Sequence, residues 1–250
     1  MNLQNLTSLA KSASLEAGRA ILSIYHSFDL GVAYKKDDSP LTKADLLAHE
    51  VIIKHLQETG LPILSEEGAD IPYETRRHWY YYWLVDPLDG TKEFIKKNGE
   101  FTVNIALIHN QQAILGVVYA PVLDCLYWGN TEDGAWKQEG NQAPIQLKNS
   151  DSEEVNTIVA SRSHLSPETE EFIAQYSDAE TISMGSSLKF MLVAENKAQL
   201  YPRFAPTMEW DTAAAQAIAE ASGRQVLTYP DLEPMKYNRE EMRNGWFLVK

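Results

Sequence analysis

Residues 79–91 read WYYYWLVDPLDGT, an aromatic and β-branched segment that runs directly into acidic residues. Such residues are enriched in strands, so the segment up to Val85 is predicted to be a buried strand. In the part that follows, the proline restricts the backbone and the glycine permits a tight turn. The sequence therefore predicts that Asp86 and Asp89 lie close together where a strand ends.

The next segment, residues 101–123, contains no Asp, Glu, Lys or Arg and is long enough to span a bilayer. Its middle, residues 109–112, reads HNQQ, and polar groups are costly at the centre of a membrane helix. The same residues suit a turn between two β-rich runs, 101–108 and 113–119. We therefore predict a buried hairpin and no transmembrane segment.

Two helices are predicted before this strand, because apolar residues recur with a 3.6-residue period over Leu3 to Tyr25 and over Leu41 to Gln57. Further short strands are predicted at residues 63–64, 126–128 and 135–136. This first part is expected to be two helices against an antiparallel sheet.

From about residue 140 the pattern changes to alternating short strands and helices. A strand is predicted at Thr157 to Ala160, and helices are predicted at Pro167 to Gln175, Ser187 to Ala194 and Trp210 to Ala221. We divide the chain into an N-terminal α+β lobe, residues 1–140, and a C-terminal α/β lobe, residues 141–250. A cleft at their interface is the expected binding site.

Composition narrows the class of protein. The 250 residues are 44% hydrophobic and 23% charged, as expected for a soluble globular chain. A net charge of −13, from 22 Lys and Arg against 35 Asp and Glu, argues against binding a nucleic-acid polymer. One cysteine, Cys125, excludes an internal disulfide and a multi-thiolate zinc site. No secretory signal is visible at the N-terminus, and the chain is expected in the cytoplasm.

Three acidic groups follow apolar runs: Glu66 with Glu67, Asp86 with Asp89, and Asp211. Mg²⁺ prefers oxygen ligands, and two ions close together need several carboxylates converging from different elements. Each group alone also has an ordinary interpretation, as a solvated loop, a turn or a favourable residue at a helix start. On these grounds alone, the metal site and the ordinary interpretations both stay open.

The run 83–94, WLVDPLDGTKEF, resembles the signature of the inositol monophosphatase-like family of lithium-sensitive, Mg²⁺-dependent phosphomonoesterases. Residues 209–214, EWDTAA, resemble the second signature of that family, and residues 65–67, SEE, resemble its upstream metal-binding pair. The three motifs occur in the right order and cover nearly the whole chain. The resemblance implies a layered α-β-α-β-α sandwich, which agrees with the predicted order of helices and sheets.

Within the family, other stretches look like the bacterial 3′(2′),5′-bisphosphate nucleotidases. These are residues 92–95, KEFI, residues 98–106, NGEFTVNIA, residues 161–164, SRSH, and the run from Tyr201 to Asp211. The implied reaction is hydrolysis of 3′-phosphoadenosine 5′-phosphate (PAP) to AMP and phosphate, with the 5′-phosphosulfate analogue (PAPS) as a second substrate and a role in sulfur assimilation. An inositol or sugar phosphatase and a non-catalytic regulator remain alternatives.

The resemblance also implies residue roles. The resemblance implies two or three Mg²⁺ ions per site and inhibition by Li⁺. The ions would be held by Glu66, Asp86, the Leu88 carbonyl, Asp89 and Asp211, with Asp211 on the second ion. Asp45 and Thr91 match the pair that orients and deprotonates the attacking water, and Glu67 sits beside the site. The residues also expected to contact the substrate here are Glu66, Leu88, Asp89, Gly90, Thr91 and Asp211.

The nucleotide is expected against the second lobe. Ser161, His164, Gly185 and Lys189 resemble positions that contact AMP in these nucleotidases. A 5′-phosphate can bind here although the protein is acidic overall, because free N–H groups at a helix start and the charge of Lys189 attract an anion locally. The alternatives are a structural Ser-x-x-His loop and a solvated lysine.

Two other enzyme classes are disfavoured. The zinc-protease motif His-Glu-x-x-His is absent at His49-Glu50, because its last position is Ile53 and not a histidine. No Gly-x-x-x-x-Gly-Lys-Ser/Thr phosphate loop occurs, which disfavours a nucleoside triphosphatase.

The resemblance leaves peripheral membrane association open, although no basic amphipathic helix requires it. The sequence gives no oligomeric state.

Overall fold

The computed structural model describes residues 1–27, 29–35, 40–149, 154–161 and 165–250. The helices are α1 (Leu3–Tyr25), α2 (Lys43–Leu56), a 3₁₀ turn (Gln57–Thr59), α3 (Tyr73–Arg76), α4 (Thr91–Ile95), α5 (Pro167–Ile173), α6 (Leu188–Ala194) and α7 (Glu209–Ala221). The strands of the first half are β1 (Ala33–Tyr34), β2 (Pro40–Leu41), β3 (Ile63–Ser65), β4 (Tyr81–Asp89), β5 (Thr102–His109), β6 (Gln112–Ala120), β7 (Cys125–Asn130), β8 (Gly134–Glu139) and β9 (Ile145–Leu147). Those of the second half are β10 (Thr157–Ser161), β11 (Glu180–Met184), β12 (Tyr201–Arg203), β13 (Thr207–Met208), β14 (Val226–Thr228), β15 (Arg243–Asn244) and β16 (Phe247–Val249).

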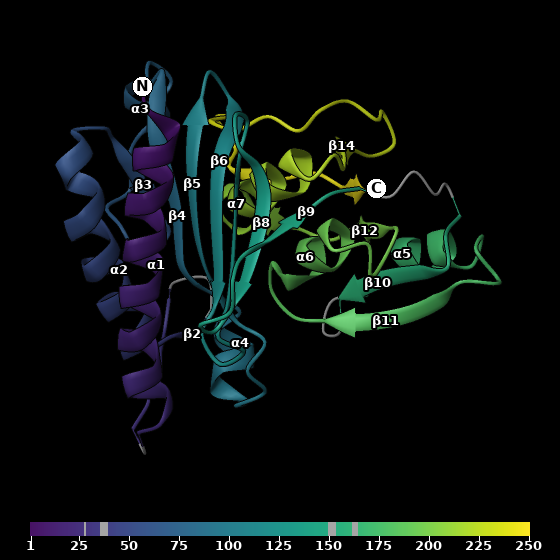
Figure 1. The fold of residues 1–250 in the computed structure, drawn as a ribbon, viewed down its shortest axis with the longest axis horizontal. Coiled ribbons are helices and arrows are strands. Elements are labelled where there is room, and N and C mark those ends of the chain that lie inside the picture. Colours follow the sequence, from purple (N-terminus) through teal and green to yellow (C-terminus); the bar gives the residue numbers. More distant parts are fainter. Residues whose placement is uncertain (28, 36–39, 150–153, 162–164) are drawn as a thin grey trace.

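Helices and sheets alternate in layers across the molecule (Figure 1). Helices α1 and α2 form the first layer, and the large sheet follows them. Helices α6 and α7 lie on the opposite side of that sheet, and the small strands of the second half lie beyond them together with α5. This is the layered arrangement that the resemblance implied.

Helices α1 and α2 pack against each other and against the sheet. Helix α1 has the bounds that its apolar period predicted, and the Asn2 side chain caps it by accepting the Asn5 N–H at 3.0 Å. Helix α2 begins later than the predicted Leu41, because Thr42 and Asp45 form a capping box at its start.

The large sheet has seven strands in the order β3-β4-β5-β6-β7-β8-β9. All neighbours are antiparallel except β3 and β4, which pair in parallel. The predicted antiparallel sheet is therefore wrong at this edge. The chain crosses back through α3 between the two strands, and such a crossover returns it in the same direction.

Strand β4 continues past the predicted end at Val85. Asp86 pairs with Asn104 of β5, and after an irregularity Asp89 pairs with Thr102. An irregularity of this kind redirects side chains at the end of a strand. Gly90 then takes a positive φ of 94°, and α4 begins at the next residue.

The charge-free segment forms the predicted hairpin, β5 and β6. Its turn is tight: His109 pairs with Gln112, and both Asn110 and Gln111 have positive φ. Within the described part of the chain, no helix is long and apolar enough to cross a membrane.

Helix α7 packs on the face of the large sheet opposite α1 and α2, in contact with β4 to β8. Two glycines of the sheet allow a close approach. A Cβ atom at Gly116 would lie 2.0 Å from the Ala214 carbonyl oxygen, and one at Gly129 would lie 3.1 Å from the Ile218 Cα. The alanine-rich face of α7 is thus in backbone contact with the sheet.

The second half contains small sheets: β10 pairs with β11 in parallel, β12-β16-β14 are antiparallel, and β13 pairs with β15. Of these strands the sequence predicted only β10. Strand β9 lies beyond residue 140 and pairs with β8, so the large sheet extends past the predicted lobe boundary. The division into two lobes stays a prediction.

Candidate active site

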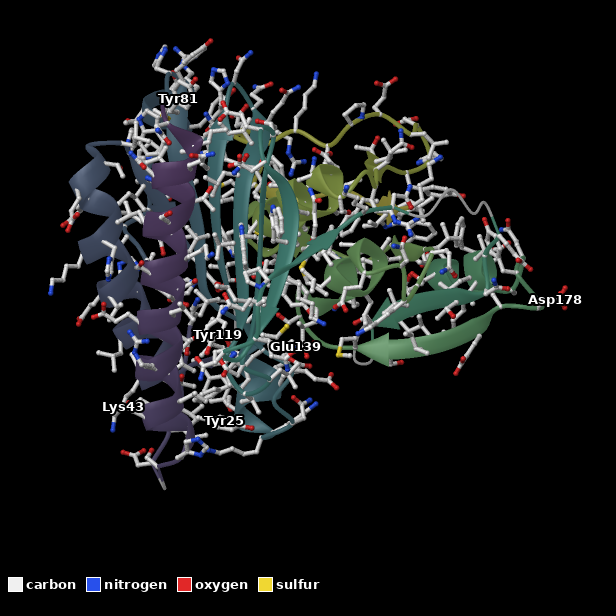
Figure 2. All side chains as sticks on the ribbon, in the orientation of Figure 1. Tyr25, Lys43, Tyr81, Tyr119, Glu139 and Asp178 are labelled. Carbon is white, nitrogen blue, oxygen red and sulfur yellow. The ribbon has the colours of Figure 1, made fainter. Side chains whose placement is uncertain are left out.

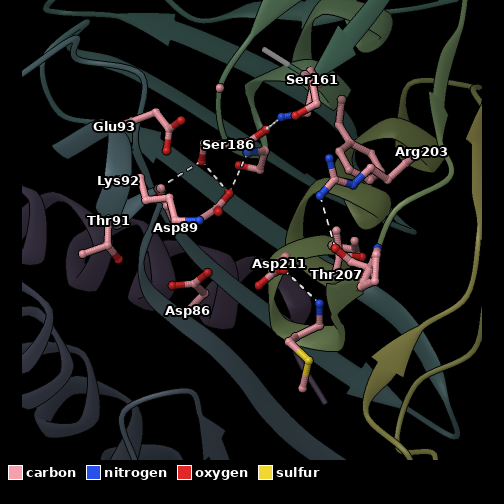
Figure 3. A pocket seen from close by; sticks show the side chains of 18 of the residues that line it. Asp86, Asp89, Thr91, Lys92, Glu93, Ser161, Ser186, Arg203, Thr207 and Asp211 are labelled. Carbon is pink, nitrogen blue, oxygen red and sulfur yellow. Dashed lines mark hydrogen bonds between the residues drawn. The ribbon is translucent and has the colours of Figure 1, made fainter. Parts of the chain in front are cut away.

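A cavity of about 400 Å³ lies where β4 ends, between α4, α6 and the start of α7 (Figure 3). Most residues predicted for the site line it: Glu66, Asp86, Leu88, Asp89, Gly90, Thr91, Ser161, Gly185, Lys189 and Asp211. Asp45 and Glu67 are not among the lining residues and lie behind it. His164 lies outside the described residues.

Four acidic side chains form one end of the cavity, and each comes from the end of an element. Glu66 follows β3, Asp86 and Asp89 close β4, and Asp211 lies in the first turn of α7. Local bonds orient two of them: Asp86 Oδ1 accepts the Leu88 N–H at 3.0 Å, and Asp211 Oδ2 accepts the Met208 N–H at 2.8 Å. We refer to this group as the carboxylate end.

The carboxylate end concentrates negative charge away from water. Burial, followed by repulsion from Glu66, Asp89 and Asp211, raises the pKa of Asp86 well above its usual range. Burial and repulsion from Asp89 and Glu66 likewise raise the pKa of Asp211. Buried carboxylates that destabilise one another in this way favour a bound cation, and oxygen donors suit Mg²⁺.

One ammonium group already lies against this end. Lys35 Nζ lies 2.7 Å from Glu66 Oε1 and 2.5 Å from Glu67 Oε1. As the side chains stand, no group of three or more His, Cys, Asp or Glu residues in the described ranges is arranged to hold a metal ion. Glu66 is directed at Lys35, and Asp89 Oδ2 accepts the Ser187 N–H at 2.7 Å. The chemistry of the donor set fits a divalent cation, and the assigned ligands stay a prediction.

Asp45 and Thr91 are joined by a hydrogen bond, and their role in activating water stays a prediction. The Thr91 hydroxyl donates to Asp45 Oδ1 at 3.2 Å, while Asp45 Oδ2 accepts the Thr42 N–H at 2.8 Å. Asp45 is 1% exposed, and burial raises its pKa. Thr91 lines the cavity, so Asp45 reaches the cavity through the threonine hydroxyl.

Cationic side chains lie at the other end. The Lys189 ammonium is buried and donates to the carbonyls of Ser186 at 2.5 Å and Met184 at 3.3 Å. Burial lowers the pKa of Lys189 to about 8. The alternative of a solvated lysine is therefore wrong. Ser161, at the end of β10, lines the same end.

Arg203 completes this cationic end, and the sequence analysis did not single it out. It is 8% exposed, and its Nη2 donates to the Pro206 carbonyl at 3.2 Å. Among the residues that the structure describes, the buried Nε and Nη1 atoms have no hydrogen-bond partner. Buried donors without partners are costly, so a cavity-lining guanidinium of this kind favours an anionic ligand. Arg243 also lines the cavity, but it is exposed at the rim.

Comparison with known proteins settles the family. The sequence model of the inositol monophosphatase family matches residues 2–242. The chain belongs to the inositol monophosphatase family.

Its relatives include two curated bacterial proteins. The 3′(2′),5′-bisphosphate nucleotidase CysQ of Salmonella typhimurium is 51% identical over 251 residues, covering 99% of this chain and 98% of the relative. The CysQ nucleotidase of Escherichia coli K12 is 50% identical over 239 residues, covering 93% and 94%. The crystal structure of CysQ from Bacteroides thetaiotaomicron superposes with a TM-score of 0.90 at 48% identity, covering 100% of this chain and 98% of that one.

Proposed function

We propose that this chain is a Mg²⁺-dependent 3′(2′),5′-bisphosphate nucleotidase that hydrolyses PAP to AMP and phosphate. One observation carries the proposal: a single cavity has a carboxylate end and a cationic end. A substrate with a phosphate at each end of a nucleoside matches both, through metal at one and through Arg203 and Lys189 at the other. The names of relatives about half identical over nearly their full length support the same substrate class.

Glu66, Asp86, the Leu88 carbonyl, Asp89 and Asp211 would hold the metal, with Asp211 on a second ion. Bound Mg²⁺ would neutralise the phosphate and lower the pKa of a coordinated water. Two or three ions per site, and inhibition by Li⁺, are part of this proposal. Binding would require Glu66 to exchange its contact with the Lys35 ammonium for the ion.

Thr91 and Asp45 act on the nucleophile. Water attacks phosphorus, the bond from phosphorus to the 3′-oxygen breaks, one proton of the water passes to the protein, and the departing 3′-oxygen takes up a proton from solvent to form the hydroxyl of AMP. The Thr91 hydroxyl, which already donates to Asp45, accepts a hydrogen bond from that water and passes its own proton to Asp45. Burial raises the pKa of Asp45, which makes it a better proton acceptor once it is ionised. Glu67 shares Lys35 with Glu66 and so orients Glu66 indirectly.

The rest of the nucleotide lies along the second half of the chain. Gly90 and Gly185 line the cavity, and Ser161 supplies a hydroxyl. Lys189 and Arg203 bind the 5′-phosphate. PAPS, which carries a sulfate on that phosphate, is a second substrate, and His164 stays a predicted contact.

We infer that the protein acts in the cytoplasm. There it would remove PAP during sulfur assimilation. The single thiol, Cys125, is buried and free, as a reducing compartment allows. Peripheral attachment to the inner membrane is tested by fractionation of cells in low and high salt.

The test is phosphate release from PAP, PAPS and inositol 1-phosphate, each with Mg²⁺, with EDTA, and with Mg²⁺ plus Li⁺. We expect release from PAP that EDTA abolishes and Li⁺ inhibits. A preference for inositol 1-phosphate would retain the metal chemistry and refute the nucleotide assignment. No release from any substrate would favour the non-catalytic alternative.

A further inference from the structure

We propose that Thr102 is a positioning residue that holds the Asp89 carboxylate in place through the hydroxyl of Ser186. It would couple the loop of the second half to the carboxylate end of the cavity. The inference deepens the proposed function and rests on it for the identity of the substrate.

The first step is the support of Asp89 by the loop before α6. The Ser187 N–H donates to Asp89 Oδ2 at 2.7 Å, and the Ser186 hydroxyl donates to the same oxygen. The Ser186 hydroxyl also lies 3.1 Å from the Asp89 carbonyl oxygen (Figure 3). The orientation of this first-half carboxylate therefore depends on where the second-half loop lies.

The second step is the position of Thr102. It is fully buried on β5 directly opposite Asp89 in the sheet register. Its Oγ1 lies 2.6 Å from Ser186 Oγ, 2.8 Å from Ser187 Oγ and 3.1 Å from Asn104 Oδ1. One hydroxyl of the first half thus meets both hydroxyls of the loop.

The third step is the direction of the hydrogen bonds. An ionised carboxylate only accepts, so the single proton of the Ser186 hydroxyl points to Asp89. Thr102 must then be the donor in its 2.6 Å contact with Ser186. The Ser187 hydroxyl donates to Asn104 Oδ1 at 2.9 Å. A directed chain runs from Thr102 through Ser186 to Asp89.

The loop before α6 is held in one conformation by its contacts. Gly185 donates its N–H to Glu100 Oε2 at 2.8 Å, and a Cβ there would lie 2.8 Å from the Glu100 carbonyl oxygen. Ser186 has a positive φ of 54°, which is unfavourable for a residue with a side chain. Lys189 donates to the Ser186 carbonyl from the other side. The contacts with the Glu100 to Asn104 segment hold this conformation.

The experiment compares Thr102→Val, which removes the hydroxyl at nearly constant volume, with Thr102→Ser, which keeps it. Mg²⁺ alone is titrated into each full-length protein by calorimetry, and kcat and KM are measured with PAP and with adenosine 3′-monophosphate. Partners that orient metal ligands are worth about 10–100-fold in affinity or activity. We expect Thr102→Val to weaken Mg²⁺ binding about 10-fold and to lower kcat for both substrates, while Thr102→Ser stays near wild type.

The matched control is Thr7→Val. Thr7 is also a buried threonine whose hydroxyl donates, to Leu3 O at 2.8 Å, but it lies in α1 away from the cavity. It should leave Mg²⁺ affinity and kcat unchanged. If Thr102→Val does not fold, Ser186→Ala, which removes the hydroxyl between Thr102 and Asp89, should still weaken Mg²⁺ binding.

Two results would overturn the inference. The first is a folded Thr102→Val or Ser186→Ala protein that binds Mg²⁺ as tightly as wild type. The second is a Thr102→Ser protein as impaired as Thr102→Val, which would assign the effect to packing. If the wild-type protein binds Mg²⁺ but hydrolyses neither substrate, the proposed function fails, and the calorimetric comparison still decides the role of Thr102.

Discussion

The two ends of the cavity are built in different ways. The carboxylate end comes from residues at the ends of β3, β4 and α7, which all contact or belong to the large sheet. The cationic end comes from small strands and a short helix of the second half, with Lys189 and Arg203 buried. Under the proposed function, the first end would determine the chemistry, because it carries the oxygens that suit a metal. The second would determine which substrate binds.

The largest expected effect is at the carboxylate end. Asp89→Asn keeps a side-chain acceptor for the Ser187 N–H but removes the charge. Loss of one electrostatic contact to a transition state costs about 10²–10³-fold in kcat. We expect a loss of this size with PAP and with adenosine 3′-monophosphate alike, measured as phosphate release at saturating Mg²⁺.

The control is the same substitution at Asp178, an exposed residue at the far tip of the second half (Figure 2). Asp178→Asn should have the wild-type rate. Retention of more than about a tenth of the rate by Asp89→Asn, against the loss expected for a metal ligand, would break the assignment of this end.

The next largest effect is expected at Arg203, whose guanidinium has two buried atoms without partners in the described part of the chain. Charge-assisted, bidentate bonds to phosphate are lost in Arg203→Ala, which should raise KM for PAP about 10–100-fold. Adenosine 3′-monophosphate, which lacks the 5′-phosphate, should be affected much less. Arg203→Lys should fall between, because a lysine keeps the charge and loses the planar fork.

Equal increases in KM for both substrates would show that Arg203 shapes the cavity as a whole. Arg203 would then not be specific for the 5′-phosphate, and the assignment of the cationic end to that phosphate would fail.

A smaller, pH-dependent effect is expected from Lys189, with its pKa of about 8. Below this pH the ammonium is charged and attracts the 5′-phosphate; above it the charge is lost. KM for PAP should therefore rise as pH increases through about 8, by up to about 10-fold. KM for adenosine 3′-monophosphate should not show this step.

Lys189→Ala is the companion measurement. It should raise KM for PAP more than for adenosine 3′-monophosphate and abolish the rise near pH 8. An unchanged pH profile in Lys189→Ala would assign the titration to another group.

The smallest effect is expected at Arg243, exposed at the cavity rim. PAPS extends beyond PAP by a sulfate, which a rim cation can reach, and exposed ion pairs are weak. Arg243→Ala should lower kcat/KM for PAPS about 2–5-fold relative to PAP. An unaltered ratio between the two substrates would limit the cationic end to Lys189 and Arg203.

The carboxylate end was predictable because its signals are local. Aromatic and β-branched residues define β4, and the acidic residues stand directly at its end. Helix α1 and the hairpin of β5 and β6 follow from periodicity and a short polar turn in the same way. The expected antiparallel pairing of β3 with β4 was wrong, since strand direction depends on the crossover between them.

The cationic end was less predictable because it depends on distant pairing. Arg203 is buried on β12, which pairs with β16 at the end of the chain, so nothing near Arg203 in sequence marks its burial. Strand β11, read as ETISM, has too few apolar positions to signal a strand. The carbonyls of Met184 and Ser186 accept hydrogen bonds from the buried Lys189 ammonium, and composition does not reveal this geometry.

The close contact between Gly116 and Ala214 has a consequence for how substrate range can change. Because the backbone of α7 lies against β6, Asp211 is fixed to the same framework as Asp86 and Asp89. Changes in β13 or in the loop before α6 would disturb Asp211 and Asp89, because Met208 and Ser187 donate to these carboxylates. Strand β12, which carries Arg203, makes no such bond to them, so under the proposed function it is the place where the span between the two ends can be redesigned.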